Sequence, residues 1–163
     1  MSSNPITESY FIIVAVIAAT ILTAAIVPSI AQISQVYNQQ AQNFQDKADL
    51  QLTIVFAAGV VGQRSATLWL KNTGVSALQP ALINRSEIFF GITGNFSRVQ
   101  YGSLGTDSWN YTILNESGNT NGNLNPGDTL QVLISLSRPL LSGDYYVQFV
   151  TYLGTTSDYT FST

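Results

Sequence analysis

The first part of the chain has the pattern of a membrane-spanning helix. Residues 10–33 are mostly apolar and contain no Asp, Glu, Lys or Arg. As a helix with about 1.5 Å of rise per residue, this segment reaches roughly 36 Å, which is enough to cross the hydrocarbon layer of a bilayer with some tilt. We therefore expect a transmembrane helix over residues 10–33, preceded by a short N-terminal tail at residues 1–9.

A cleaved secretory signal is the alternative interpretation of this segment. Such a signal has a basic first region and a small-residue cleavage site after a shorter apolar core. Residues 1–9 contain no Lys or Arg and carry Glu8. We therefore expect a retained anchor.

A polar segment rich in Gln, Asn and Ser follows at residues 34–48, and we expect it to continue the helix as a neck. Pro28, near the far end of the membrane segment, removes one backbone donor and can bend the axis. An apolar stripe recurs at three-, four- and seven-residue steps. It consists of Ile30, Ile33, Tyr37 and Phe44. Two interpretations stay open, a seam for a partner helix and packing on the chain's own C-terminal domain.

Residues 49–163 alternate between apolar and polar positions, which predicts β-strands. The first strand places four apolar residues on one face: Leu50, Leu52, Ile54 and Phe56. Further strands are predicted at residues 65–71, 87–92, 98–101, 109–114, 130–136, 145–149 and 159–161. About seven strands with frequent turns and no helical period are typical of a two-sheet sandwich. The predicted fold class is therefore an all-β sandwich preceded by one transmembrane helix.

The composition excludes several function classes. Charged residues are 9% of the 163, where about 25% is usual, and six Lys and Arg are too few to neutralise a run of phosphates. The chain has no His and no Cys, so the usual proton shuttle, thiolate nucleophile and soft-metal ligands are missing. The carboxylates of the β domain are scattered singly, and no glycine-rich phosphate loop occurs. We expect no enzyme, no catalytic residues, no cofactor, no metal site and no nucleic-acid partner.

Four Asn-x-Ser/Thr triplets lie in the β domain. They begin at Asn84, Asn95, Asn110 and Asn115. Such triplets are acceptors for N-glycosylation outside the cytoplasm. As a set they favour an extracytoplasmic domain, whereas the Lys and Arg content is too low to set the membrane orientation.

Two aromatic residues are candidates for a protein interface. Trp69 falls on the polar phase of its predicted strand, and Phe89 falls on the phase opposite Ile88 and Phe90. Exposed aromatic side chains are enriched at binding surfaces. The alternative is that a loop or a closed sheet edge covers each of them.

The chain resembles the FlaG and FlaF proteins of the archaeal motility machine. The resemblance covers the N-terminal anchor, the Gln-rich neck and four strand-and-turn patterns, at Leu68–Gly74, Glu87–Gly91, Leu124–Asp128 and Gly143–Tyr145. It implies an immunoglobulin-like domain outside the cytoplasmic membrane. It also implies a stationary role, in which two paralogues associate and tie the rotary archaellum motor to the surface-layer (S-layer) lattice. The neck and the Lys71–Gly74 pattern resemble FlaG more than FlaF.

A second resemblance, confined to the helix, is to type IV pilins. Glu8 and Pro28 correspond to the acidic residue and the proline of pilin helices, but no Lys/Arg-Gly processing site precedes Glu8. For Glu8 the alternative is a carboxylate placed favourably at a helix N-terminus.

We therefore expect a single-pass membrane protein with its C-terminal domain outside the cell membrane. Its predicted function is a static mechanical connection by protein contact, with a FlaF-type paralogue, the S-layer and further copies of the chain as partners. The alternative is a pilin-like subunit that forms surface filaments.

Overall fold

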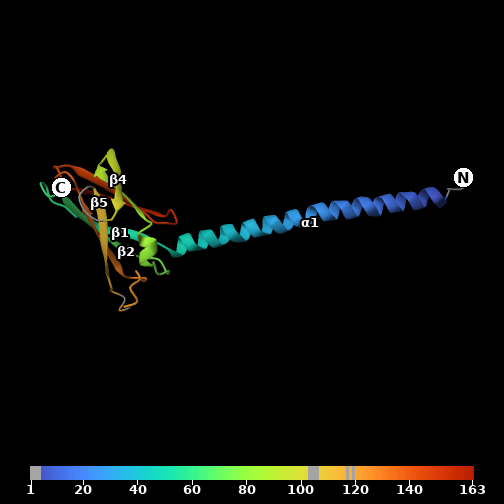
Figure 1. Ribbon diagram of the computed structural model, residues 1–163, viewed down its shortest axis with the longest axis horizontal. Coiled ribbons are helices and arrows are strands. Elements are labelled where there is room, and N and C mark those ends of the chain that lie inside the picture. Colours follow the sequence, from blue (N-terminus) through green and yellow to red (C-terminus); the bar gives the residue numbers. More distant parts are fainter. Residues whose placement is uncertain (1–4, 103–106, 117, 119) are drawn as a thin grey trace. The chain divides into compact units, whose positions relative to one another are not determined.

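The computed structural model describes residues 5–102, 107–116, 118 and 120–163. The chain divides into two compact units, and the division falls between Phe44 and Gln45. The first unit is helical, and the second contains the strands (Figure 1). An apolar N-terminal helix followed by an all-β domain is therefore confirmed.

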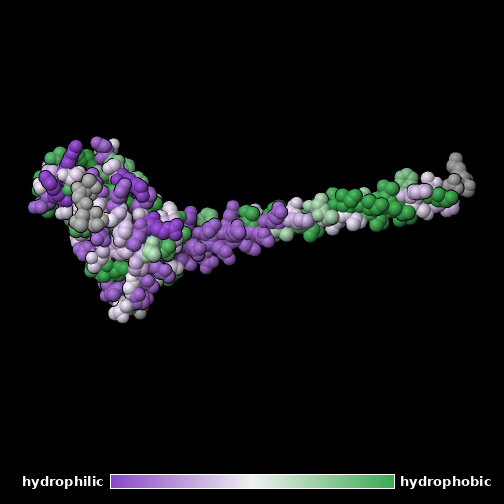
Figure 2. Space-filling view, viewed as in Figure 1, coloured by the Kyte–Doolittle hydropathy of each residue, from purple (hydrophilic) through white to green (hydrophobic). Residues whose placement is uncertain are grey.

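The helix α1 (Pro5–Asp49) has an apolar N-terminal half and a polar C-terminal half (Figure 2). Glu8 lies in its first turn, where the helix dipole favours a carboxylate. Thr20 donates a hydrogen bond to the carbonyl of Val16, and Thr23 donates one to Ala19. Hydroxyls that are satisfied within the helix can enter an apolar medium at low cost. In the described residues, α1 is the one helix long and apolar enough to cross a membrane.

The helix begins at Pro5, so residues 5–9 of the expected tail are helical, and it runs through the expected membrane segment and neck without a break. Pro28 lies inside it.

Eight strands and one short helix follow α1. Their bounds are β1 (Leu52–Gly59), β2 (Ser65–Asn72), α2 (Pro80–Ile83), β3 (Glu87–Ile92), β4 (Asn95–Tyr101), β5 (Ser108–Leu114), β6 (Thr129–Ser135), β7 (Asp144–Val150) and β8 (Thr156–Ser162). They form one sheet in the order β1-β2-β6-β5-β4-β3-β7-β8. Adjacent strands are antiparallel except β4 and β5, which pair in parallel over two residue pairs.

The sheet folds back on itself, so that its two halves share one core. At one side, the backbone N–H of Ile54 on β1 donates a 2.9 Å hydrogen bond to the hydroxyl of Ser157 on β8, which joins the first strand to the last. Across the middle, the rings of Trp109 on β5 and Phe149 on β7 meet edge to face with centroids 6.1 Å apart. Inward side chains from both halves therefore exclude water together.

The core is built from the predicted alternation. The fully buried residues include Leu68 and Leu70 on β2, and Ile88 on β3. The three strands after Asp128 contribute the inward sets that the pattern predicts, which are Leu130, Val132, Ile134, Tyr145, Val147 and Phe149, with Tyr159 and Phe161 packed against them.

The position predicted for Phe56 is wrong. A β-bulge between Ile54 and Phe56 adds one residue to β1 and reverses the alternation after it. Ala57 takes the inward position, while Phe56 is 52% exposed on the outer face.

The short helix α2 lacks a sequence prediction because one turn is too short to show a helical period. Pro80 occupies its first turn, where proline costs no hydrogen bond. Ile83 anchors this turn in the core.

A buried polar junction connects the start of the β domain to two of its strands. The side-chain amide of Asn72 donates to the carbonyls of Ser76 (2.9 Å) and Leu124 (3.0 Å). The backbone of Asn72 pairs with the turn before β6, donating to the carbonyl of Asp128 and accepting from the N–H of Gly127. Because Asn72 and Asp128 are almost fully buried, each unmade hydrogen bond here would cost the full desolvation penalty.

The carboxylate of Asp128 stabilises the same turn by accepting backbone hydrogen bonds. Its Oδ1 accepts from the N–H of Glu116 at 2.9 Å, and its Oδ2 accepts from the N–H of Asn125 at 2.9 Å. Two of the motifs singled out in the sequence, Lys71–Gly74 and Asn125–Asp128, therefore meet at one place.

The loop after Asn72 holds the end of α1. The N–H groups of Thr73 and Gly74 donate to the carbonyl of Gln51, and those of Val75 and Ser76 donate to the carbonyl of Asp49. A Cβ at position 74 would lie 2.6 Å from the nitrogen of Gln51 and closer still to the carbonyl oxygen of Asp49. Glycine is required there because the two backbones touch.

We predict that Asn72→Ala lowers the free energy of unfolding by roughly 2–4 kcal/mol, because two buried carbonyls lose their donor. Urea unfolding of the detergent-solubilised chain, followed by the fluorescence of Trp69 and Trp109, measures the change. Asn95→Ala is the matched control, since Asn95 is exposed, and should stay within about 0.5 kcal/mol of the parent. Equal midpoints for the two variants would contradict the role of the junction.

We also predict a change in titration beside the junction. The ammonium of Lys71 donates to Glu116 at 3.1 Å, and this bond, with the one from Thr129, lowers the pKa of Glu116. A carboxylate with a lowered pKa adds stability above its unfolded pKa and loses it as the pH falls through the folded value. Lys71→Met should raise the pKa of Glu116 toward its ordinary value in a carboxyl NMR titration, whereas Lys47→Met should leave it unchanged.

Candidate interaction surfaces

The outer face of β1, β2 and β6 carries an apolar cluster. Trp69 lies opposite Phe56 in the register of β1 and β2, and the two rings are in contact with centroids 5.5 Å apart. Leu133, on the neighbouring strand β6 and opposite Thr67, is 47% exposed on the same face. We call Phe56, Trp69 and Leu133 the outer aromatic cluster. Trp69 is half-buried, and part of what covers it is the exposed ring of Phe56.

Phe89 lies on the outer face of the other half of the sheet. It is half-buried between Arg98 on β4 and Gln148 on β7. Arg98 forms an ion pair with Glu87 on the same face, at 2.9 Å. Polar partners therefore flank Phe89 on both neighbouring strands, and its immediate surroundings are more polar than the outer aromatic cluster.

One further aromatic pair lies beyond Phe89 on that face. The rings of Phe96 and Tyr146 approach to 4.8 Å, with Gly91 on the strand between them. A Cβ at Gly91 would lie 2.6 Å from the Cα of Phe96, so glycine lets β3 and β4 approach closely there. The sequence does not predict Phe96 on this face, because Phe96 lies before the strand predicted at residues 98–101, whereas β4 begins at Asn95.

The apolar stripe of α1 lies on a helix that buries none of its residues. Its exposed fractions range from 55% at Ile33 to 77% at Phe44. These side chains are available to a partner, to lipid or to another part of the chain.

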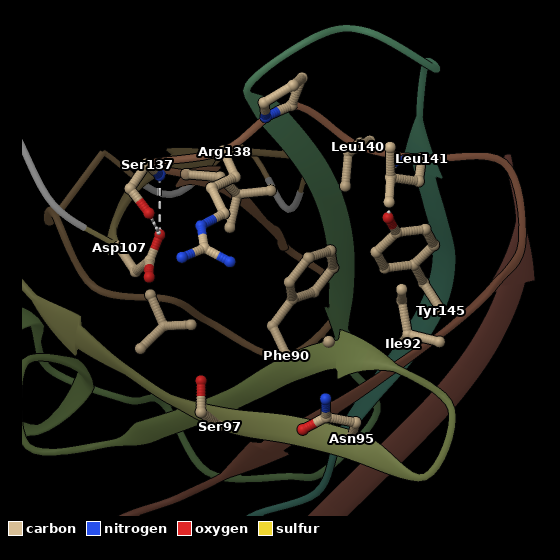
Figure 3. A pocket seen from close by; sticks show the side chains of 14 residues that line it. Phe90, Ile92, Asn95, Ser97, Asp107, Ser137, Arg138, Leu140, Leu141 and Tyr145 are labelled. Carbon is tan, nitrogen blue, oxygen red and sulfur yellow. Dashed lines mark hydrogen bonds between the residues drawn. The ribbon is translucent and has the colours of Figure 1, made fainter.

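A cleft lies between β3, β4 and the segment that follows β6, and its volume is about 580 Å³ (Figure 3). Its apolar side is formed by Phe90, Ile92, Leu140, Leu141 and Tyr145, and its polar side by Asn95, Ser97, Asp107, Ser137 and Arg138. The sequence does not predict this cleft, because residues 136–141, which connect β6 to β7, come next to β3 and β4 only in the folded chain.

The wall of the cleft is fixed by hydrogen bonds. Asp107 accepts bonds from the N–H (2.7 Å) and the hydroxyl (3.0 Å) of Ser137. The hydroxyl of Tyr145 accepts a 2.9 Å bond from the N–H of Leu141. The ionisable side chains in the described lining are Asp107, Arg138 and Tyr145. They do not form the pair of a nucleophile and a neighbouring general base that covalent catalysis requires.

No group of three or more His, Cys, Asp and Glu that could hold a metal occurs in the part of the chain that the structure describes.

The four candidate glycosylation sites are all exposed asparagines, in four different settings. Asn84 ends α2 and accepts a hydrogen bond from the hydroxyl of Tyr111, while the hydroxyl-bearing Ser86 of its triplet is buried. Asn95 begins β4, and Asn110 lies within β5. Asn115 follows β5, and the third residue of its triplet, at position 117, lies outside the described residues. Their modification stays a prediction.

Comparison with known proteins identifies the family. A family model for archaeal-type flagellins matches residues 3–161. An uncharacterized protein of Archaeoglobus fulgidus is 26% identical over 166 residues, which covers 99% of each chain.

Two solved structures from Sulfolobus acidocaldarius are similar in fold and sequence. The archaellum periplasmic stator protein FlaG is 30% identical with a TM-score of 0.57, and the match covers 69% of this chain and 99% of that one. A complex of the archaellum periplasmic stator proteins FlaF and FlaG contains a chain that is 29% identical with a TM-score of 0.57, covering 68% of this chain and 88% of that one. The chain therefore belongs to the archaeal-type flagellin family and is a FlaG-like archaellum protein.

Proposed function

We propose that the chain is a stationary, non-enzymatic part of the archaellum motor, a stator protein anchored in the cell membrane by α1. The observation that carries this proposal is the 30% identity to the periplasmic stator protein FlaG across 99% of that chain. A static connection needs an anchor and a rigid body with surfaces for protein contact. The helix α1 supplies the first, and the sheet with its shared core supplies the second.

We infer that the β domain is an immunoglobulin-like sandwich. One half of the sheet runs β1-β2-β6-β5, which corresponds to the order A-B-E-D of an immunoglobulin domain. The other half runs β4-β3-β7-β8 and corresponds to C-F-G with one additional strand beside C. The two residue pairs between β4 and β5 are the sole ladder that joins these halves in the described residues.

We propose that residues 10–33 lie in the membrane, that residues 34–48 form a helical neck and that residues 49–163 form the domain outside the cell membrane. The charge-free apolar segment supports the first assignment. Four exposed asparagines in glycosylation triplets support an extracytoplasmic domain.

The proposed partners are a FlaF-type paralogue, the S-layer and other copies of this chain. The first is supported by the solved complex of the FlaF and FlaG proteins of Sulfolobus acidocaldarius. The outer aromatic cluster is the surface that we propose for protein contact, because contiguous exposed aromatic and aliphatic side chains on a sheet face are typical of interfaces. Phe89 is a second candidate, with charged and amide neighbours that suit a more polar interface.

A pilin-like filament subunit is the alternative function. One observation favours it, which is that the flagellin family model extends over the helix as well as the domain. The state of the mature N-terminus separates the two functions, because a filament subunit loses the residues before its apolar helix.

We predict that the chain isolated from membranes retains Met1 or Ser2, and that it stays in the membrane fraction after alkaline extraction. A helix with 24 charge-free, mostly apolar residues binds the bilayer too strongly for a change of pH to release it. Intact-mass determination and immunoblotting of the extracted fractions provide the measurement. Cleavage directly before the apolar segment would instead identify a filament subunit, and a chain found in the soluble fraction would remove the anchor.

We predict that Trp69→Ser and Phe56→Ser each weaken binding of a FlaF-type paralogue about tenfold or more, because each removes a large apolar contact from the interface. Titration of the detergent-solubilised full chain with the paralogue measures the affinity. Val75→Ser is the matched control, because Val75 is 74% exposed in the loop after β2, away from the cluster. The urea unfolding midpoint reports whether each variant is folded. Unchanged affinity in both cluster variants would show that the paralogue binds elsewhere.

A further inference from the structure

Five of the seven large apolar residues between positions 26 and 44 of α1 follow a seven-residue period, and the other two, Val27 and Val36, fall on the flanking positions e and g. If Ile30 is position a of a heptad, Tyr37 and Phe44 also fall on a, and Ile26 and Ile33 fall on d. The remaining d position between Tyr37 and Phe44 is Gln40. We call these six residues the heptad row; they are Ile26, Ile30, Ile33, Tyr37, Gln40 and Phe44.

The residues outside the heptad row support one contact side on this helix. The outward positions c and f carry amides at Gln32, Gln35, Gln39 and Gln42. Pro28 also falls on f, so the ring that interrupts the hydrogen-bond ladder points away from the row. One side of the helix is therefore apolar and regular, and the opposite side carries the polar groups and the proline.

The neck needs packing to be a stable helix in water. It is rich in Asn, Ser and Gln, and helices of this length gain most of their stability from an apolar face that is covered. Tyr37 and Phe44 are 69% and 77% exposed, so the helix by itself does not cover this face.

The occupant that fits the row is a second copy of the same chain. Copies anchored by the same helix enter the membrane with the same orientation, so their helices are parallel and each residue meets its equivalent at the same depth. From Ser9 to Gln45 the helix has no Asp, Glu, Lys or Arg, so two identical helices meet without repulsion. The amide of Gln40 is both donor and acceptor and can pair with the same amide across the axis.

We propose that α1 forms a parallel, in-register pair with α1 of a second copy along the heptad row. This inference rests on the proposed membrane anchoring, because the shared orientation depends on it. The pair presents two β domains side by side on one stem, so that each stator unit binds its partner through two sheet faces.

Single cysteines test the register directly, because the natural chain has none. Ile33→Cys and Gln40→Cys place a thiol on the row, and Gln35→Cys and Gln39→Cys are the matched controls on the outward positions f and c. A disulfide forms where Cβ atoms come within about 4.5 Å, and in a parallel pair the equivalent residues at a and d positions lie nearer to each other than those at c and f. Each full-length variant is oxidised in native membranes, and the disulfide-linked dimer is quantified on non-reducing gels.

We expect dimer yields at positions 33 and 40 that exceed those at 35 and 39 by about fivefold or more. Equal yields at all four positions would indicate random collision and overturn the inference. Absent dimer at all four would overturn it too, since the row would then be covered by lipid, by the chain's own domain or by a helix of another protein. In a mixture of two variants, a disulfide from position 33 to a different position, and not to position 33 of the other copy, would indicate staggered packing as in a filament. That result would also overturn the in-register pair.

Alkaline extraction of the same membranes separates this inference from the proposed function. Variants that stay in the membrane without forming the dimer contradict the helix pair alone. Variants that are extracted contradict the anchor, and with it both proposals.

Discussion

The connection between α1 and the sheet depends on one buried asparagine. Asn72 is the last residue of β2, and its side chain and backbone join the loop that holds Asp49 and Gln51 to the turn that precedes β6. A force applied along the helix therefore reaches β1 through the chain and reaches β2 and β6 through hydrogen bonds. The side-chain amide of Asn72 and the carboxylate of Asp128 are both buried away from water. Their hydrogen bonds therefore cannot be exchanged for bonds to solvent without a large cost in free energy. The stator role that we propose depends on such a buried connection between the end of α1 and the strands that follow it.

The domain achieves its rigidity with little charge. Two ion pairs, Lys71 with Glu116 and Arg98 with Glu87, occur in the described residues, and both are about half exposed. Pairs of this kind contribute about 0–1 kcal/mol each. Stability therefore comes from the apolar core shared by the two halves of the sheet and from the ladders between strands. It follows that moderate changes of salt concentration should affect the fold little, while each substitution in the core should affect it strongly.

The sequence predicts the helix, the strands and most of the core residues, because each of these follows from a pattern that repeats over two to four residues. The bulge in β1 does not follow such a pattern. Because of it, Phe56 lies on the surface beside Trp69 and not in the core. The pairing of Asn72 with the turn at Asp128 could not be predicted either, although both motifs were noticed, because 56 positions separate them and register depends on the whole sheet. The cleft beside Arg138 has the same origin, since its walls come from β3, β4 and the segment after β6. The alternation along a strand does predict that Trp69 and Phe89 lie on the outer face, because the face of a residue depends only on its position in the local period.

The two proposed contacts differ in chemistry, and the membrane lets each of them be weak. The heptad row has six residues and the outer aromatic cluster has three. The contact area of each is therefore small compared with the interfaces of permanent complexes in solution. Anchoring in a bilayer fixes the orientation of every copy and confines it to a plane, so much of the rotational and translational cost of association is already met. Joining two domains on one stem then makes the second partner contact intramolecular, with an effective concentration set by the neck. A charge-free helix segment and an aromatic sheet face can therefore support a lasting assembly without the charged or extensive interfaces that a soluble complex would need.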